Sequence, residues 1–258
     1  MYPKTFKDLL KGHYPNNYIG QGNPFAKILI IAKECTNTDD LEYKKIIADN
    51  FLDWQNQPSP EQIPNWLDCG FDWQQYYPLQ PFKGQRMLIH RNNNHGTNAT
   101  FYAYQKFINA LLPPENRAAR GEMLNFYDYC FITELSTKCK KYSGKREVST
   151  AQSIQDRLLR EDAILRQPFF QQFPIIILAC FRYYDMYGID IQTLFNTHFV
   201  PPTNEITKHE FINKHISSDG KRLLLHTNHF SMRSNTFIEA LAAECKAFIK
   251  QQNISLTN

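Results

Sequence analysis

The stretch that decides the fold is KILIIAKECT, at residues 27–36. Its four consecutive aliphatic residues, 28–31, are followed at once by small, charged and polar residues. A continuous apolar run of this length is typical of a strand that is buried on both faces, as in a parallel sheet. In open α/β sheets, ligands bind beyond the carboxyl ends of such strands. The first candidates for a functional site are therefore Lys33, Glu34, Cys35 and Thr36.

Three more buried strands are predicted, at residues 126–135, 173–180 and 221–226. Amphipathic patterns predict helices at 39–51, 98–112, 149–166 and 234–251. Strands that alternate with helices indicate a three-layer α/β/α fold with a central, mainly parallel four-stranded sheet. One edge of that sheet would collect the strand ends Lys33-Glu34, Thr133-Glu134, Cys180 to Arg182 and His226 to Asn228.

The chain is predicted to form a single α/β domain over residues 1–258, with an aromatic-rich insertion at about 52–97. We interpret the insertion as a packed segment that covers one sheet edge, with a binding lid as the alternative. Gly20 and Gly22 precede the first strand, whereas the glycines of a dinucleotide-binding loop follow their strand. The sequence thus excludes that kind of nucleotide site here.

Composition sets broad limits on location and partners. A formal net charge of +4 permits an acidic partner such as nucleic acid without demanding one. The six cysteines are scattered without a CxxC pair, which favours free thiols in a reducing compartment. No run of eighteen apolar residues would span a membrane, and the N-terminal stretch lacks the apolar core of a secretory signal. We therefore expect a cytoplasmic monomer with no membrane association.

Two of the predicted strand ends resemble motifs of the uracil-DNA glycosylase superfamily. In that family a Gly-Gln-Asp-Pro-Tyr or Gly-Glu-x-Pro-Gly segment follows the first strand, and here residues 32–36 read AKECT. The family's last strand ends in His-Pro-Ser before a short loop that enters DNA, and here HTN at 226–228 precedes HFSMR at 229–233. The likeness extends in order and spacing over roughly residues 20–36 and 98–252, with different letters at Ala32, Cys35 and Thr227.

The resemblance implies a uracil-DNA-glycosylase-like fold and a DNA glycosylase that cleaves the N-glycosidic bond of a damaged or deaminated base flipped from DNA. By this comparison Glu34 would stabilise the cationic sugar or orient a water, and His226 would donate to the base oxygen. Phe230 or Met232 would serve as the wedge. Substrate contacts would come from Lys33, Thr36, Thr133, Glu134 and Asn228, and DNA contacts from His229, Phe230, Ser231, Met232, Arg233 and Lys138.

Each assignment has a structural alternative. Glu34 would cap the next helix, and His226 would be a hydrogen-bonded structural histidine. Lys33 would be a solvated charge, Glu134 would pair with Lys138, and Phe230 and Met232 would pack under the terminal helix. The altered motif letters also favour a second function: a catalytically inactive protein of the same fold that binds nucleic acid or a nucleotide-like ligand. No metal-ligand spacing or Walker loop is recognised, so no metal or cofactor is expected.

Overall fold

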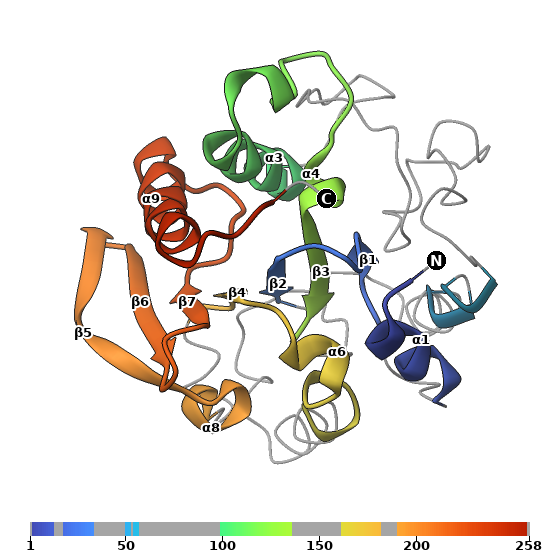
Figure 1. Ribbon diagram of the computed structural model, residues 1–258. Helices are drawn as coiled ribbons and strands as arrows, with labels where there is room; N and C mark the ends of the chain where they lie inside the picture. Colours follow the sequence, from blue (N-terminus) through green and yellow to red (C-terminus); the bar gives the residue numbers. More distant parts are fainter. Residues whose placement is uncertain are drawn as a thin grey trace, which may run out of the picture.

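The computed structural model describes residues 2–12, 18–33, 50–52, 54–56, 99–135, 161–181 and 190–256 (Figure 1). The predicted helices at 39–51 and 149–166 and most of the insertion at about 52–97 lie outside these residues. The helical elements are α1 (Lys4–Lys11), α3 (Ala99–Leu111), η3 (Pro114–Asn116), α4 (Phe126–Tyr129), η5 (Glu161–Leu165), α6 (Pro168–Gln171), α8 (Ile191–Phe195) and α9 (Asn235–Gln252). The strands are β1 (Gln21–Gly22), β2 (Ile28–Ala32), β3 (Cys130–Glu134), β4 (Ile175–Ala179), β5 (Thr197–Thr207), β6 (Glu210–Ser217) and β7 (Leu223–Thr227).

The described strands form one mixed, seven-stranded sheet in the order β1-β3-β2-β4-β7-β6-β5. Strands β3, β2, β4 and β7 pair in parallel, whereas β1 pairs antiparallel with β3, and β5 and β6 continue antiparallel from β7. The prediction of a mainly parallel, four-stranded sheet is therefore wrong. Antiparallel strands extend the parallel centre at both of its edges, as Figure 1 shows for β1 on one side and β5 on the other.

The β5–β6 hairpin was missed because its sequence carries no buried run. No buried strand is predicted between residues 180 and 221, yet residues 197–207 and 210–217 form two long strands. Most side chains of β5 are exposed, so the strand is held by main-chain pairing with β6 rather than by apolar side chains. Pairing of this kind leaves little trace in a hydrophobic pattern.

The register of the parallel strands brings their carboxyl ends level with one another. Ala32, the last residue of β2, lies opposite Glu134 of β3 on one side and Ala179 of β4 on the other. On the far side of β4, Leu178 lies opposite His226 of β7. The chain that leaves these four strands therefore emerges along one common edge of the sheet.

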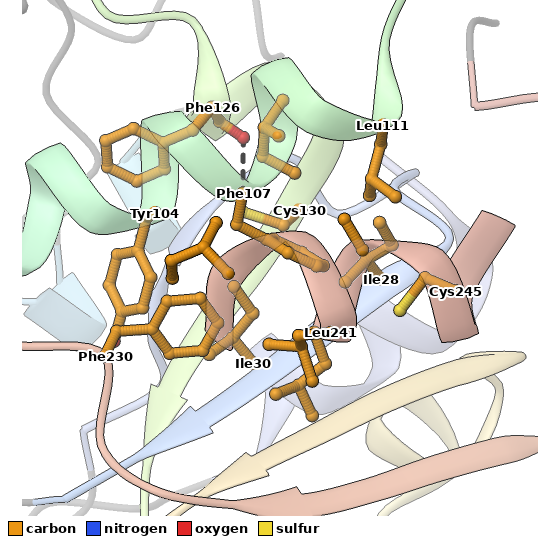
Figure 2. Packing of buried hydrophobic residues seen from close by; sticks show 14 of the residues in the cluster. Ile28, Ile30, Tyr104, Phe107, Leu111, Phe126, Cys130, Phe230, Leu241 and Cys245 are labelled. Carbon is orange, nitrogen blue, oxygen red and sulfur yellow. Dashed lines mark hydrogen bonds between the residues drawn. The ribbon is translucent and has the colours of Figure 1, made fainter. Parts of the chain in front are cut away.

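Helices cover both faces of the sheet (Figure 1). Alternate side chains of each parallel strand face opposite ways, so Ile28 and Ile30 join one core cluster while Leu29 and Ile31 join the other. The first cluster lies under α3, α4 and α9, and Figure 2 shows its aromatic part around Tyr104 and Phe230. The second cluster lies under α1, α6 and α8.

The segment before β2 is held by hydrogen bonds from two side chains to the main chain of Gly20. The Asn50 side chain accepts from the Gly20 amide and donates to its carbonyl, which also accepts from the Trp54 indole at 2.8 Å. A Cβ at Gly20 would lie 2.4 Å from the carbonyl oxygen of Ile132, and its φ is +136°. Glycine is therefore required where this segment begins to pair with β3. No helix in the described ranges has the length and apolarity needed to cross a bilayer.

Candidate functional site

Phe181, the residue that follows β4 and Cys180, joins the ends of three parallel strands. Its carbonyl oxygen lies 2.6 Å from Nε2 of His226, and its amide donates to the carbonyl of Thr227 at 2.9 Å. The Lys33 ammonium, just past β2, lies 5.7 Å from the centre of the Phe181 ring. The backbone of Phe181 is left-handed, with φ of +55°. The ends of β2, β4 and β7 thus meet around one residue, as the parallel strands predicted.

His226 is held from both sides of its ring. With Phe181 accepting from Nε2, the remaining nitrogen, Nδ1, is left to accept from the Asn213 side-chain amide at 3.4 Å. The Phe211 ring packs edge-on against the imidazole, which is almost fully buried. In this arrangement the N–H predicted to reach a base oxygen is directed at a main-chain carbonyl. The hydrogen bond between the imidazole and Phe181 fixes the end of β4 relative to β7.

The end of β3 places two predicted substrate contacts on opposite faces of the sheet. Thr133 and Glu134 are both buried at this edge. Burial raises the pKa of Tyr104, with smaller contributions from Cys130 and from the negative charge of Glu134. The carboxylate of Glu134 therefore lies on the α3 side of the sheet, close enough to Tyr104 to affect its ionisation.

Side-chain hydrogen bonds of Asn228 link the chain after β7 to the β5–β6 hairpin. Its side-chain oxygen accepts from the amide of Phe211 at 2.9 Å, and its side-chain nitrogen donates to the carbonyl of His209 at 3.0 Å. The hydroxyl of Thr227 donates to the carbonyl of Phe211. The predicted substrate contact Asn228 thus bonds to main chain through both of its polar atoms, and it positions the loop that follows.

The two candidate wedges in that loop lie in opposite environments. Phe230 is fully buried, with its ring 4.8 Å from that of Tyr104 and 5.6 Å from that of Phe107 (Figure 2). It anchors the loop in the core and is not available to enter DNA. Met232, two residues later, has 87% of its surface exposed and a left-handed backbone with φ of +60°. A core position for Met232 is ruled out by this exposure.

Positive charge acts on the first residue of the loop at residues 229–233. Burial lowers the pKa of His229 to about 4, and the charges of Lys33 and Arg233 add to the effect. Arg233 belongs to the loop itself, whereas Lys33 follows the last residue of β2. Lys106 of α3 donates to the side chain of Asn235 at the start of α9, just beyond the loop. Two cations from separate parts of the chain therefore act on His229, and a third lies at the start of α9.

Glu210 holds the end of the loop in place. Its carboxylate accepts from the amide of Ser234 at 2.9 Å and from the Ser234 hydroxyl at 2.7 Å. Burial raises the pKa of Glu210, but the hydrogen bonds from Ser234 and Thr207 and the charge of Arg233 outweigh it, so that the pKa lies below its ordinary value. The Ser234 oxygen in turn caps α9 by accepting from the amide of Phe237.

A pocket of about 310 Å³ opens between Phe181 and the tip of the β5–β6 hairpin. Its wall includes Lys208, His209 and Glu210, next to the loop at residues 229–233. The hairpin that the sequence did not reveal thus forms one side of the candidate site. The backbone position of Phe181 was the one part of this wall that the sequence placed correctly, since it follows a predicted strand.

The predicted site residues divide into three groups. Nine of those with described positions lie along one edge of the sheet or in the loop beyond it, and Phe230 packs in the core below that loop. Glu34, Thr36 and Lys138 lie outside the described residues. The nine at the edge or in the loop are Lys33, Thr133, Glu134, His226, Asn228, His229, Ser231, Met232 and Arg233.

Comparison with known proteins adds no family assignment: no protein-family model matches this chain, and no curated protein or solved structure matches it either. Fold and site together define a class, an α/β protein with a mixed sheet and a cationic strand edge. No group of three or more metal-ligating side chains is assembled within the described part of the chain. The DNA partner, the monomeric state and the cytoplasmic location stay predictions.

Proposed function

We propose that this protein binds DNA at the carboxyl edge of its parallel strands, and that Met232 inserts between bases there. The observation that carries the proposal is the exposed Met232 side chain on an anchored loop, with Arg233 next to it in the chain and the charge of Lys33 acting on His229 of the same loop. Apolar wedges of this kind separate stacked bases, and basic residues beside them hold the phosphates.

The anchoring of the loop supports insertion. Phe230 fixes one side of Met232 in the core, and Ser234 fixes the other through Glu210 and the cap of α9. A non-glycine residue in the left-handed region costs roughly 1–2 kcal/mol. The surrounding contacts hold Met232 in this conformation, so little further ordering of the loop would be needed on binding.

We further propose, on the resemblance to the uracil-DNA glycosylase superfamily, that the bound base is excised. Glu34 follows Lys33 directly and would be the carboxylate that stabilises the sugar cation. Because the His226 N–H is directed at the Phe181 carbonyl, His226 would hold the pocket wall rather than touch the base. The negative charge that develops on the leaving base would instead be stabilised by the cations of this edge, chiefly by Lys33.

Binding is tested with fluorescently labelled duplex DNA over a range of salt concentrations. Removing a phosphate contact should lower the salt slope by about 1 per contact. The double variant Lys33→Gln, Arg233→Gln should therefore bind more weakly and with a slope that is smaller by up to about 2. The matched control is Lys246→Gln, Lys250→Gln, which removes the same charge from exposed positions further along α9. Equal losses in both doubles would contradict a localised site.

Excision is tested separately, with duplexes that contain uracil or hypoxanthine and with detection of abasic sites. Glu34→Gln should abolish base release and leave duplex binding within about twofold, since it removes a reacting carboxylate and not a phosphate grip. Salt-dependent binding without release from any lesion would support the binding function alone. Loss of binding at low salt would overturn both parts of the proposal.

A further inference from the structure

A second pocket, of about 330 Å³, lies where α8 faces the β5–β6 hairpin. Asn213 and His215 are two residues apart on β6, so both side chains lie on the face that this pocket occupies. His226 of β7 lies opposite Asn213. The ring of Phe199 and the side chains of Asp190 and Gln192 also line the pocket. Its volume is at the lower end of the range for small-molecule sites.

Two buried polar atoms in this wall have no hydrogen-bond partner among the described residues: Oδ1 of Asn213 and Nδ1 of His215. The orientation of the Asn213 amide is set, because its nitrogen faces Nδ1 of His226 at 3.4 Å. Its oxygen is consequently left as an acceptor. A buried polar atom without a partner is destabilising, so two in one pocket indicate a place where a ligand supplies the partners.

The charges around the pocket restrict the class of ligand. Among the described residues that line the pocket there is no lysine or arginine, so these residues offer no counter-charge to an anionic group. The carboxylate of Asp190 is engaged in capping α8, where it accepts from the amide of Thr193 at 3.0 Å. Burial, with a smaller contribution from His198, lowers the pKa of His215 to about 4, so its ring is neutral at physiological pH.

We propose that this pocket binds a small, neutral, flat molecule that carries a carboxamide or lactam group. The N–H of that group donates to Oδ1 of Asn213, and its carbonyl accepts from His215 in the tautomer that carries hydrogen on Nδ1. The ring of the ligand packs against Phe199, whose own ring lies 5.5 Å from that of His215. The pocket lies on the hairpin face and involves neither Met232 nor the cations of the strand edge, so the inference does not depend on DNA binding.

Benzamide and benzoate provide a matched pair of probes, because they share a shape and differ in charge and in hydrogen-bond donors. Binding is followed on the full-length protein by ligand-observed NMR and by amide shifts of β5 and β6. Benzamide is expected to bind and to shift these amides, whereas benzoate is not. Failure of benzamide to bind at its solubility limit, or equal binding of benzoate, would overturn the proposal.

Two variants locate the site. His215→Phe keeps an aromatic ring but removes both imidazole nitrogens, Nδ1 among them, and it should weaken benzamide binding roughly tenfold or more. Its melting temperature should not fall, because Nδ1 has no hydrogen-bond partner among the described residues. The control His198→Phe makes the same change one strand away, at an exposed residue of β5 that does not line the pocket, and it should leave binding unchanged.

Phe199→Ala, at a partly exposed position, removes the packing surface for the ring and should also weaken benzamide binding. A His215→Phe protein that melts at a lower temperature would show that a ring nitrogen of His215 stabilises the folded chain, which contradicts the inference. Unchanged binding in both His215→Phe and Phe199→Ala would place any benzamide site elsewhere and would likewise overturn it.

Discussion

Nε2 of His226 lies 2.6 Å from the carbonyl oxygen of Phe181, and this hydrogen bond joins the ends of β7 and β4. Lys33, past the end of β2, lies over the ring of the same phenylalanine. The contact explains how residues far apart in the chain come to share one site. It also gives the imidazole a structural task that the motif comparison alone did not show.

Replacement of His226 by phenylalanine should destabilise the fold. The variant leaves the Phe181 carbonyl and the Asn213 amide without the ring nitrogens that they now face. We expect the free energy of unfolding in urea to fall by about 1–3 kcal/mol. The same change at the exposed His209, whose main-chain carbonyl is kept, should alter it by less than about 0.5 kcal/mol. Equal stabilities of the two variants would show that the Phe181 contact contributes nothing.

Substitutions at Met232 should separate stability from DNA binding. Met232→Gly relieves a left-handed backbone, worth roughly 1–2 kcal/mol, and adds chain entropy to the unfolded state, worth roughly 0.5–1 kcal/mol. Thermal unfolding should therefore show no loss of stability. Met232→Ala keeps the strained backbone and should be the less stable of the two. Both variants should lose the unstacking of a 2-aminopurine reporter in duplex DNA, and retention of this signal would contradict the wedge.

Glu210 should make the stability of the protein depend on acid pH. Its pKa in the folded protein lies below the ordinary value of 4.5, so folding favours the ionised form. The resulting stabilisation is complete above the unfolded pKa and is lost as the pH falls through the folded pKa. Urea unfolding from about pH 6 to about pH 3 should therefore show a smaller decline in Glu210→Gln than in the native protein. Glu205→Gln, an exposed carboxyl on the same hairpin, is the control and should keep the native decline.

Gly20→Ala should disrupt the packing of the N-terminal segment against β3. The added Cβ would meet the Ile132 carbonyl at 2.4 Å and the Phe131 ring at 2.5 Å, in a backbone conformation with φ of +136°. We expect a loss of about 2 kcal/mol or more in the free energy of unfolding. Gly121 provides the control, because its φ is also positive and a Cβ there would meet nothing within 4 Å. If the two alanine variants lose equal stability, backbone conformation alone decides the effect.

The centre of the sheet was predictable because its signal is local. The run at residues 28–31 is apolar throughout, and β2 is buried along its whole length, as a strand covered by helices on both faces must be. The start of the terminal helix was equally visible, since Ser234 caps α9. The hairpin of β5 and β6 could not be seen in this way, because β5 carries mostly exposed side chains and is held by main-chain pairing, and β6 has no continuous buried run.

The sequence by itself determined which strands are buried and that Lys33 and His226 would come to one edge, because continuous apolar runs specify parallel strands whose ends are level. Only the tertiary structure decided where each side chain at that edge points and which groups it contacts. Phe230 and Met232 are both apolar and nearly adjacent, yet the left-handed turn at Met232 sends one into the core and the other into solvent. Side-chain direction and hydrogen-bond partner depend on neighbours brought from other strands, and no local pattern encodes them.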